Sequence, residues 1–320
     1  MACASPAISI QNQSQDFSQN DYLLDTEWDF NHTNVTRREL PLFIHKLYET
    51  HASLFPKTTT RILFNTNNNG SSRIMKFNLN SLKPNKEQVL EADLYFFWPL
   101  DSNSTIYRES VVMRLYQFEK QKDAAAGDSA AENPDIHKVF NVIYISKAQR
   151  GWQTFKIKKP IDNWLNGEEN LGLLLTISSY DDNKLITIFN DTNNGIYSTF
   201  AIITVQNNDT VSSFNTVEYK THGTPTNCQR TEWNVNFQYK NWNKFIISPD
   251  GFRAYDCSGK CLGTEEDHEN HLKLLYTYHR RPPCCVPVEY SPLPIMFYDK
   301  YGNVIIKNYQ NMIVTKCGCR

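Results

Sequence analysis

The sequence lacks a large net charge of either sign, a long apolar run and a recognisable export signal. Its 320 residues carry 33 Lys and Arg against 34 Asp and Glu, so the composition predicts no general attraction to nucleic acid or to a membrane surface. No stretch is apolar over the length of a transmembrane helix. The opening MACASPAISI has no basic start and too short an apolar run for a signal peptide. We therefore expect neither a nucleic-acid partner nor membrane insertion.

Cysteine is almost absent before residue 228, where only Cys3 occurs, and dense after it. A cysteine cluster of this density usually replaces a hydrophobic core that is too small to hold a fold alone, and it forms in oxidising compartments. We expect a secreted, extracellular protein, and hence a natural N-terminus that differs from the printed one; non-conventional export is the alternative. The clustered residues are Cys228, Cys257, Cys261, Cys284, Cys285, Cys317 and Cys319.

The spacing within CSGKC and CGC suggests how a compact knot could form. If Cys257 joined Cys317 and Cys261 joined Cys319, the two segments would close a ring of eight residues. A third bridge from Cys228 could pass through so small a ring only if no side chain filled it, which suits Gly259 and Gly318. The pairing stays open at this point, because six cysteines allow fifteen connectivities.

Neighbouring residues on a strand point to opposite faces, so one cysteine of the Cys284–Cys285 pair could enter the knot while the other faces outward. An odd cysteine in a secreted module suggests a bond to a second chain. The alternative is a zinc site that uses His268, His271 and His279, but CC and CxC match zinc knuckles poorly. Nothing resembles the turn that carries a catalytic nucleophile. We therefore expect no enzyme activity, no cofactor and no metal.

Three segments of the last third carry a resemblance to a known family. They are WNKFIISPDGFRAYDCSGKC (242–261), CCVP (284–287) and IKNYQNMIVTKCGCR (306–320). The region resembles the mature ligand domain of the transforming growth factor β superfamily and is most similar to its bone morphogenetic protein branch. The resemblance implies an all-β cystine-knot growth factor, with two β-hairpin fingers and one helix. It implies the bonds Cys228–Cys285, Cys257–Cys317 and Cys261–Cys319, and an interchain bond at Cys284.

The earlier part of the chain resembles the prodomain of the same superfamily. The similar segments are LPLFIHKLY (40–48), MKFNLNSLKPNKEQVLEADLYFF (75–97) and GWQTFKIKKPIDNWLNGEENLGL (151–173). We therefore expect an α+β prodomain at the N-terminus and the cystine knot at the C-terminus. The predicted boundaries are a flexible lead at 1–35, the prodomain at 36–205, a polar linker at 206–227 and the ligand domain at 228–320.

Hydrophobic periodicity predicts the main elements. One predicted helix has an apolar stripe made of Leu40, Phe43, Ile44, Leu47 and Tyr48, and Pro41 fits its first turn. This helix either packs in the core of its own domain or, as the resemblance implies, lies on the ligand. Alternation predicts a strand from Trp233 to Tyr239. The remaining predictions are strands at 74–79, 92–98, 139–145, 172–177, 201–205, 286–298 and 303–316, and helices around 161–165 and 264–279.

The sequence departs from the family pattern in two places. The linker contains only Lys220 and His222 as basic residues, so it lacks the R-x-x-R site that relatives present to a furin-like convertase. The segment between Cys261 and Cys284 has 22 residues and starts Leu262-Gly263-Thr264, without the Pro-aromatic loop of many relatives. The resemblance therefore predicts neither cleavage by a furin-like convertase nor the identity of the type I receptor.

The resemblance also implies receptor surfaces and partners. The partners are a second copy of the chain, its own prodomain, type I and type II receptor serine/threonine kinases, and extracellular antagonists. The type I surface would include Trp242, Phe245, Leu272, Leu275, Ile295 and Tyr309. The type II surface would include Ser248, Pro249, Ser291, Leu293, Pro294 and Ile306.

Seven N-x-S/T sequons fit a secreted glycoprotein: Asn12, Asn31, Asn34, Asn69, Asn103, Asn190 and Asn208. These observations predict the precursor of a dimeric growth factor that assembles receptor kinases. The alternative is an uncut, ligand-like antagonist or matrix component.

Overall fold

The structure is a computed structural model, and it divides into two compact units. The sheet unit comprises 34–209 together with 298–307, and the knot unit comprises 1–33, 210–297 and 308–320. The residues that the structure describes are 37–54, 58–67, 73–98, 110–118, 137–146, 149, 151–191, 195–207, 228–261, 278 and 284–319.

The chain is mostly β-structure with few helices. The helices are α1 (Leu42–Leu54) and α3 (Lys158–Leu165), with short 3-10 turns η4 (Gly195–Tyr197), η5 (Phe237–Lys240) and η6 (Trp242–Lys244). The strands of the first two thirds are β1 (Thr58–Phe64), β2 (Glu87–Trp98), β3 (Val111–Gln117), β4 (Lys138–Ile145), β5 (Gly151–Lys156), β6 (Leu173–Ser179), β7 (Leu185–Ile188) and β8 (Phe200–Asn207). Those of the last third are β9 (Gln229–Thr231), β10 (Asn234–Asn236), β11 (Ile246–Ser248), β12 (Gly251–Arg253), β13 (Asp256–Ser258), β14 (Cys285–Tyr298) and β15 (Val304–Cys319).

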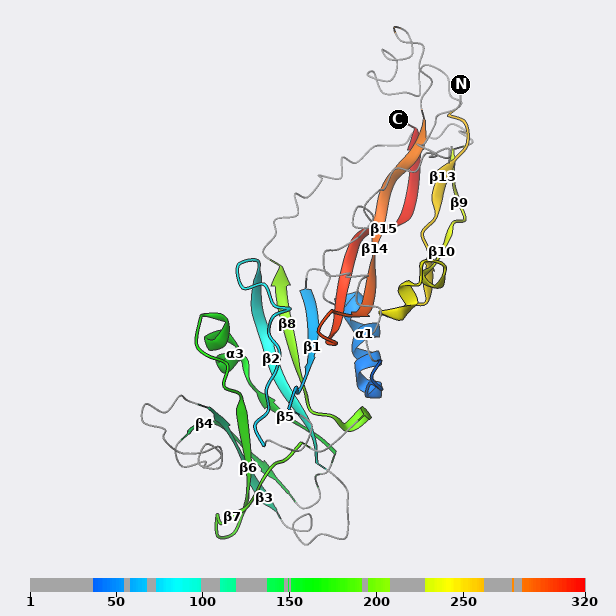
Figure 1. Ribbon diagram of the computed structural model, residues 1–320. Coiled ribbons are helices and arrows are strands. Elements are labelled where there is room, and N and C mark those ends of the chain that lie inside the picture. The colour runs from blue at the N-terminus through cyan, green and yellow to red at the C-terminus, as the bar shows by residue number, and fades with distance from the viewer. Residues whose placement is uncertain are drawn as a thin grey trace, which may run out of the picture. The chain divides into compact units, whose positions relative to one another are not determined.

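Two antiparallel sheets form the sheet unit (Figure 1). One sheet has the order β4-β3-β6-β7; in the other, β1, β8, β2 and β5 are neighbours, and the first part of β15 pairs with the free side of β1. This last pairing sets Thr59 opposite Lys307 and Ile62 opposite Val304. A strand from the last hairpin thus extends the sheet that β1, β8, β2 and β5 form.

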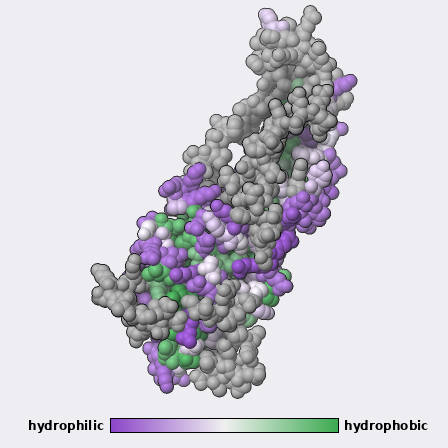
Figure 2. All heavy atoms as spheres, in the orientation of Figure 1, coloured by the Kyte–Doolittle hydropathy of each residue, from purple (hydrophilic) through white to green (hydrophobic). Residues whose placement is uncertain are grey.

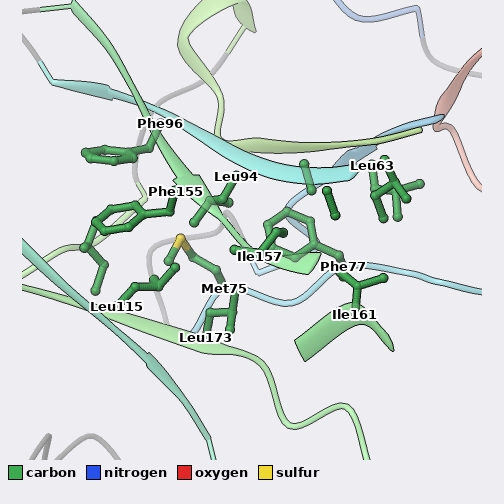
Figure 3. Close-up of a cluster of buried hydrophobic side chains, with 14 of the residues drawn as sticks. Leu63, Met75, Phe77, Leu94, Phe96, Leu115, Phe155, Ile157, Ile161 and Leu173 are labelled. Carbon is green, nitrogen blue, oxygen red and sulfur yellow. The ribbon is translucent and has the colours of Figure 1, made fainter. Parts of the chain in front are cut away.

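Alternate residues of the two sheets meet in one core. Met113 of β3, Leu175 of β6 and Ala201 of β8 have no exposed surface, as the period of two along a strand requires. Figure 3 shows Phe96 and Phe155 side by side in this core, with ring centroids 5.7 Å apart. Ile161 of α3 belongs to the same cluster, so α3 is a core helix.

Helix α1 confirms the predicted stripe and starts just after Pro41. Ile44 is fully buried, and the ring of Phe43 lies 5.4 Å from Tyr95, 5.6 Å from Phe200 and 5.7 Å from Trp152. These three rings stand on β2, β8 and β5. Phe43 therefore packs on the sheet of its own unit. This agrees with the prediction that the helix belongs to the core of its own domain.

The knot unit consists of short two-stranded ladders and one long hairpin. β13 pairs with β9, β10 with β12, and β11 with β14, beside which β15 runs. The hairpin strands confirm the predictions for 286–298 and 303–316.

Two predicted strands are wrong in part. β10 ends at Asn236, whose side chain accepts a hydrogen bond from Gln238 N–H and starts the 3-10 turn η5. Phe237 and Tyr239 therefore lie in a turn, because a local Asn cap competes with strand pairing. In 74–79 only Met75 and Phe77 form isolated bridges. The predicted helix at 264–279 lies outside the described residues except for Tyr278.

The surface in Figure 2 mixes hydrophilic side chains with smaller hydrophobic areas, the latter most evident on the lower part, which is the sheet unit. Independently of the figure, Val142 and Tyr144 of the edge strand β4 are exposed. Among the residues that the structure describes, no helix is long and apolar enough to cross a membrane.

Candidate functional site

Three disulfides hold the base of the knot unit. They join Cys228 to Cys285, Cys257 to Cys317 and Cys261 to Cys319, with Cα–Cα distances of 5.3, 5.7 and 5.8 Å. These distances fall within the usual span of about 4.4–6.8 Å. The bonds are consistent with a cystine knot.

The sulfur atoms of the knot are packed together. The Sγ atoms of Cys228, Cys261 and Cys319 lie within 4.8 Å of one another, so the Cys228–Cys285 bond runs against the Cys261–Cys319 bond. Each of these sulfurs is already oxidised. Zinc binds thiolates, and the disulfides leave no thiolate at these three positions.

The two glycines of the ring have separate reasons to be glycine. Gly259 has φ +123°, which side chains with a Cβ rarely adopt. At Gly318 a Cβ would lie 2.9 Å from Cγ1 of Val288 on the facing strand. The first glycine therefore satisfies a backbone requirement, and the second allows β15 to approach β14 closely.

Further contacts tie β15 to the segment before the knot. Val314 N–H donates to the carbonyl of Ala254 at 2.9 Å, and Arg230 donates to the carbonyl of Val314 at 3.3 Å. The guanidinium of Arg230 also lies 4.0 Å from the ring centre of Tyr255. These contacts hold β15 beside the residues that follow Cys228 and the residues that precede Cys257.

Cys284 is adjacent to the knot but is not one of its six cysteines. It bridges Lys260 across the ladder and is itself disulfide-bonded. Its role between chains stays a prediction.

The residues predicted for the type I receptor surface do not all lie at the surface of the described chain. Trp242 is half-buried against Phe237, with ring centroids 5.8 Å apart. Phe245, Ile295 and Tyr309 are buried. Leu272 and Leu275 lie outside the described residues.

The residues predicted for the type II receptor surface divide in the same way. Ser248, Pro249, Ser291 and Pro294 are half-buried, whereas Leu293 is 8% exposed and Ile306 is fully buried. Ile306 faces Thr60 in the β1–β15 pairing. A partner could meet the side chain of Ile306 only after that part of the chain had opened.

The fingertip, Tyr298–Lys307, is the turn end of the long hairpin. Its contacts were not predicted from the sequence. The hydroxyl of Tyr298 accepts from Arg38 N–H and donates to the Arg38 carbonyl, both at 3.1 Å. Burial raises the pKa of Tyr298 above its ordinary value. The only sequence signal was the position of Tyr298 at the end of an apolar run.

Asp299 caps the fingertip turn. Its Oδ1 accepts from Tyr301 N–H at 2.8 Å and from Asn303 N–H at 2.9 Å, and its Oδ2 accepts from Asn303 Nδ2 at 3.2 Å. Burial raises the pKa of this carboxyl, while the hydrogen bonds from Asn303 and Tyr301 and the charge of Arg61 act in the opposite direction. The net direction is upward, so burial outweighs the favourable partners.

Of the seven predicted glycosylation sites, only Asn190 lies within the described residues. Its side chain is half-buried, and its Oδ1 atom has no exposed surface. The others, Asn12, Asn31, Asn34, Asn69, Asn103 and Asn208, lie outside the described residues.

Comparison with known families adds two matches. Residues 11–190 match the model of the TGF-beta propeptide, and residues 227–319 match that of the transforming growth factor beta like domain. The second match contains all six cysteines of the three disulfides.

Individual relatives are similar over parts of the chain. Derriere protein of Xenopus tropicalis is 28% identical over 183 residues, which are 52% of this chain and 52% of the relative. Bone morphogenetic protein 2 of Tetraodon nigroviridis is 36% identical over 107 residues, 31% of this chain and 26% of the relative. Bone morphogenetic protein 4 of Mus musculus is 37% identical over 102 residues, 29% of this chain and 25% of the relative. The chain thus spans about half of the length of Derriere protein and about a quarter of the length of each of the two bone morphogenetic proteins.

Proposed function

Because the chain belongs to the transforming growth factor β family, with the family's propeptide followed by its ligand domain, we propose that it is the precursor of a secreted, dimeric ligand that assembles type I and type II receptor serine/threonine kinases. Growth factors of this family are signalling ligands and not enzymes. The chain is accordingly a growth factor precursor similar to the bone morphogenetic proteins. Its receptors, its dimer and its export are the proposed part.

The observation that carries the proposal is a knot unit held by three disulfides within a match to the ligand domain. A disulfide stabilises mainly by restricting the unfolded chain, by about 2–4 kcal/mol each. Such cross-links let a small module keep large side chains at its surface. Trp233, Tyr239 and Tyr290 are exposed in this unit, and exposed aromatic residues are enriched where proteins meet partners.

The proposed dimer uses Cys284 as its covalent link. Cys284 stands next to Cys285, which bonds Cys228. Because neighbouring residues of an extended segment point to opposite faces, the disulfide of Cys284 would join the second chain in the proposed dimer. A twofold dimer would present each receptor surface twice, and two engaged sites increase avidity. The predicted surfaces around Trp242 and Ser248 would then be the contact regions for type I and type II receptors.

The test uses the full chain expressed behind an added export signal, with conditioned medium analysed before and after reduction. We expect a covalent dimer that becomes monomeric on reduction, and we expect Cys284→Ser to abolish it. Cys3→Ser is the matched control, because it removes the other cysteine that is outside the knot. A dimer that survives Cys284→Ser and disappears with Cys3→Ser would contradict the assignment.

Receptor assembly has its own readout. We expect the medium to induce phosphorylation of receptor-regulated transcription factors in responsive cells, and we expect a soluble type II receptor ectodomain to block it. Binding of that ectodomain without any phosphorylation would instead support an antagonist.

A second candidate function is that of an uncut, ligand-like antagonist or matrix component. The specific observation in its favour is the linker 206–227, which has no R-x-x-R sequence. This second function would be supported over the signalling precursor if the conditioned medium, analysed after reduction, contained the full-length chain and no shorter fragment, and if the medium also inhibited a co-applied ligand.

A further inference from the structure

A pair of adjacent basic residues lies shortly before α1, in a segment without regular secondary structure. Both Arg37 and Arg38 are exposed. The sequence contains three such pairs, and the other two are followed directly by Pro160 and Pro282. A proline at that position resists serine proteases that cut after basic residues, because its ring fixes φ and removes the N–H. Of the three pairs, only Arg37–Arg38 is therefore followed by a bond that such a protease can readily hydrolyse.

The fingertip holds the backbone of Arg38. The Tyr298 hydroxyl accepts from the Arg38 N–H and donates to the Arg38 carbonyl, both at 3.1 Å, and Tyr298 is only 4% exposed. The side chain of Arg38 is held as well, because its guanidinium lies 4.8 Å from the ring centre of Phe64. Arg38 thus has an exposed surface, while its two backbone hydrogen-bonding groups and its charged group are all engaged within the sheet unit.

These engaged groups are the ones that a serine protease has to bind. Such a protease receives the carbonyl oxygen of the bond that it cuts in an oxyanion hole of N–H donors. It also places the side chain before that bond in a specificity pocket. Because the Arg38 carbonyl accepts from Tyr298 and the Arg38 guanidinium lies on Phe64, both must be withdrawn before the chain can be cut after Arg38.

Tyr298 stands on a paired segment, which links this withdrawal to the state of the fingertip. Val304–Lys307 pairs with Thr59–Ile62 of β1. The carboxylate of Asp299 closes the turn between Tyr298 and that pairing by accepting two backbone N–H groups. An opening of the fingertip therefore releases the backbone of Arg38 at the same time.

We propose that the Arg38–Glu39 bond is a processing site for a serine protease that cuts after basic residues, and that Tyr298 keeps this site closed while the fingertip is paired with β1. The protease serine attacks the Arg38 carbonyl carbon, and the Glu39 nitrogen takes a proton and leaves as an amine. Water then hydrolyses the acyl-enzyme, so that Arg38 ends as a carboxylate. The inference rests on the proposed function only in that secretion brings the chain to such proteases.

The first test is limited digestion of the purified full chain with trypsin, in which mass spectrometry measures how fast an N-terminus at Glu39 forms. We expect Tyr298→Phe, which removes only the hydroxyl, to accelerate this cut about tenfold, which corresponds to about 1.4 kcal/mol. Tyr116→Phe is the matched control, because Tyr116 is a buried tyrosine on β3 of the other sheet, and it should leave the rate unchanged. An unchanged rate in Tyr298→Phe, or an equal increase in Tyr116→Phe, would overturn the proposal.

Cleavage after Arg114, which lies within β3, shows in the same digests whether a variant has unfolded. If Tyr298→Phe accelerates both cuts, the wild-type chain provides the test through amide hydrogen exchange at Arg38. We expect slow exchange there, because the N–H donates to the Tyr298 hydroxyl. Exchange at the rate of an unfolded chain would mean that this N–H is not held, and the proposal would be wrong.

Secreting cells show whether the bond is processed. We expect the Tyr298→Phe chain, expressed behind an added export signal, to reach the medium with Glu39 as its N-terminus, and we expect the further change Arg38→Gln to prevent this. A Tyr298→Phe chain that trypsin cuts but that reaches the medium intact at this bond would show that the bond is not a processing site. A chain that is cut at this bond and does not signal would count against the proposed function alone.

Discussion

At the scale of single residues, the knot depends on close approach at Gly318. We expect Gly318→Ala to destabilise the folded chain by about 1–3 kcal/mol, the usual cost of overpacking, because the new methyl group would lie 2.9 Å from Cγ1 of Val288. Urea unfolding under non-reducing conditions measures the effect. Val288→Ala added to Gly318→Ala should recover part of the loss, and an equal loss in both variants would show that the clash is not the cause.

We expect Asp299 to make the stability of the sheet unit depend on pH. Burial raises the pKa of this carboxyl above its ordinary value of 3.8, so the folded state binds the proton more tightly than the unfolded state does. Stability from this group therefore increases as the pH falls through the window between the raised value and 3.8, and it is lost as the pH rises through that window. Asp299→Asn should remove this dependence.

The measurement compares urea unfolding of wild type and Asp299→Asn from near-neutral to mildly acidic pH. Taking the difference between the two curves cancels the titration of the other groups. Wild type should gain stability relative to the variant on acidification. A relative loss would show that the carboxylate is better stabilised in the folded chain than its burial indicates.

Single residues were predictable where their covalent or backbone role is local. The cysteine spacing and the family resemblance indicated the three bonds that the structure contains, and both ring glycines have physical reasons to be glycine. Arg38 and Tyr298 are separated by 260 positions in the sequence. No periodicity relates them, so the hydrogen bonds between them could be found only in three dimensions.

At the scale of elements, Phe43 is a main contact between α1 and its sheet. We expect Phe43→Ala to detach the start of α1, at a cost of about 2–4 kcal/mol, because Phe43 contacts the rings of Tyr95, Trp152 and Phe200. Limited trypsin digestion near Arg37 and Arg38 would report the detachment. The adjacent Leu42 is 81% exposed, so Leu42→Ala is the matched control and should leave the digestion rate unchanged. Equal sensitivity of the two variants would contradict this role for Phe43.

Most of the predicted helices and strands within the described residues are present, including the short helix around 161–165, and two predicted strands fail in part. The helical stripe around Phe43 and the two strands of the last hairpin are present as expected. The strand from Trp233 failed because the side chain of Asn236 caps a 3-10 turn, which breaks an alternation that residue type alone favours. The segment 74–79 alternates well but pairs only at two points, since pairing depends on a partner strand that its own sequence does not encode.

At the scale of the whole molecule, the resemblance anticipated two domains, but the compact units do not follow the chain order. The fingertip clusters with the sheet unit, although the boundary predicted at 228 assigns it to the other domain. Domain boundaries read from composition assume that a domain is continuous in sequence. A hairpin that adds a strand to another unit's sheet violates that assumption without any change in composition.

Processing is the property of the whole molecule that separates the two proposed functions, and the linker allows it to be tested directly. Val217→Arg together with Lys220→Arg would create an R-x-x-R sequence in a linker that has none. In secreting cells we expect a convertase to hydrolyse the peptide bond after position 220 and to release a C-terminal fragment that begins at Thr221. The fragment should run as a disulfide-linked dimer, because all three knot disulfides and Cys284 lie within it. Val217→Arg alone is the control and should stay uncut.

If the cleaved chain signals more strongly than the control, the uncut linker limits an otherwise competent ligand. If cleavage leaves an inhibitory activity unchanged and produces no signal, the antagonist is the better description.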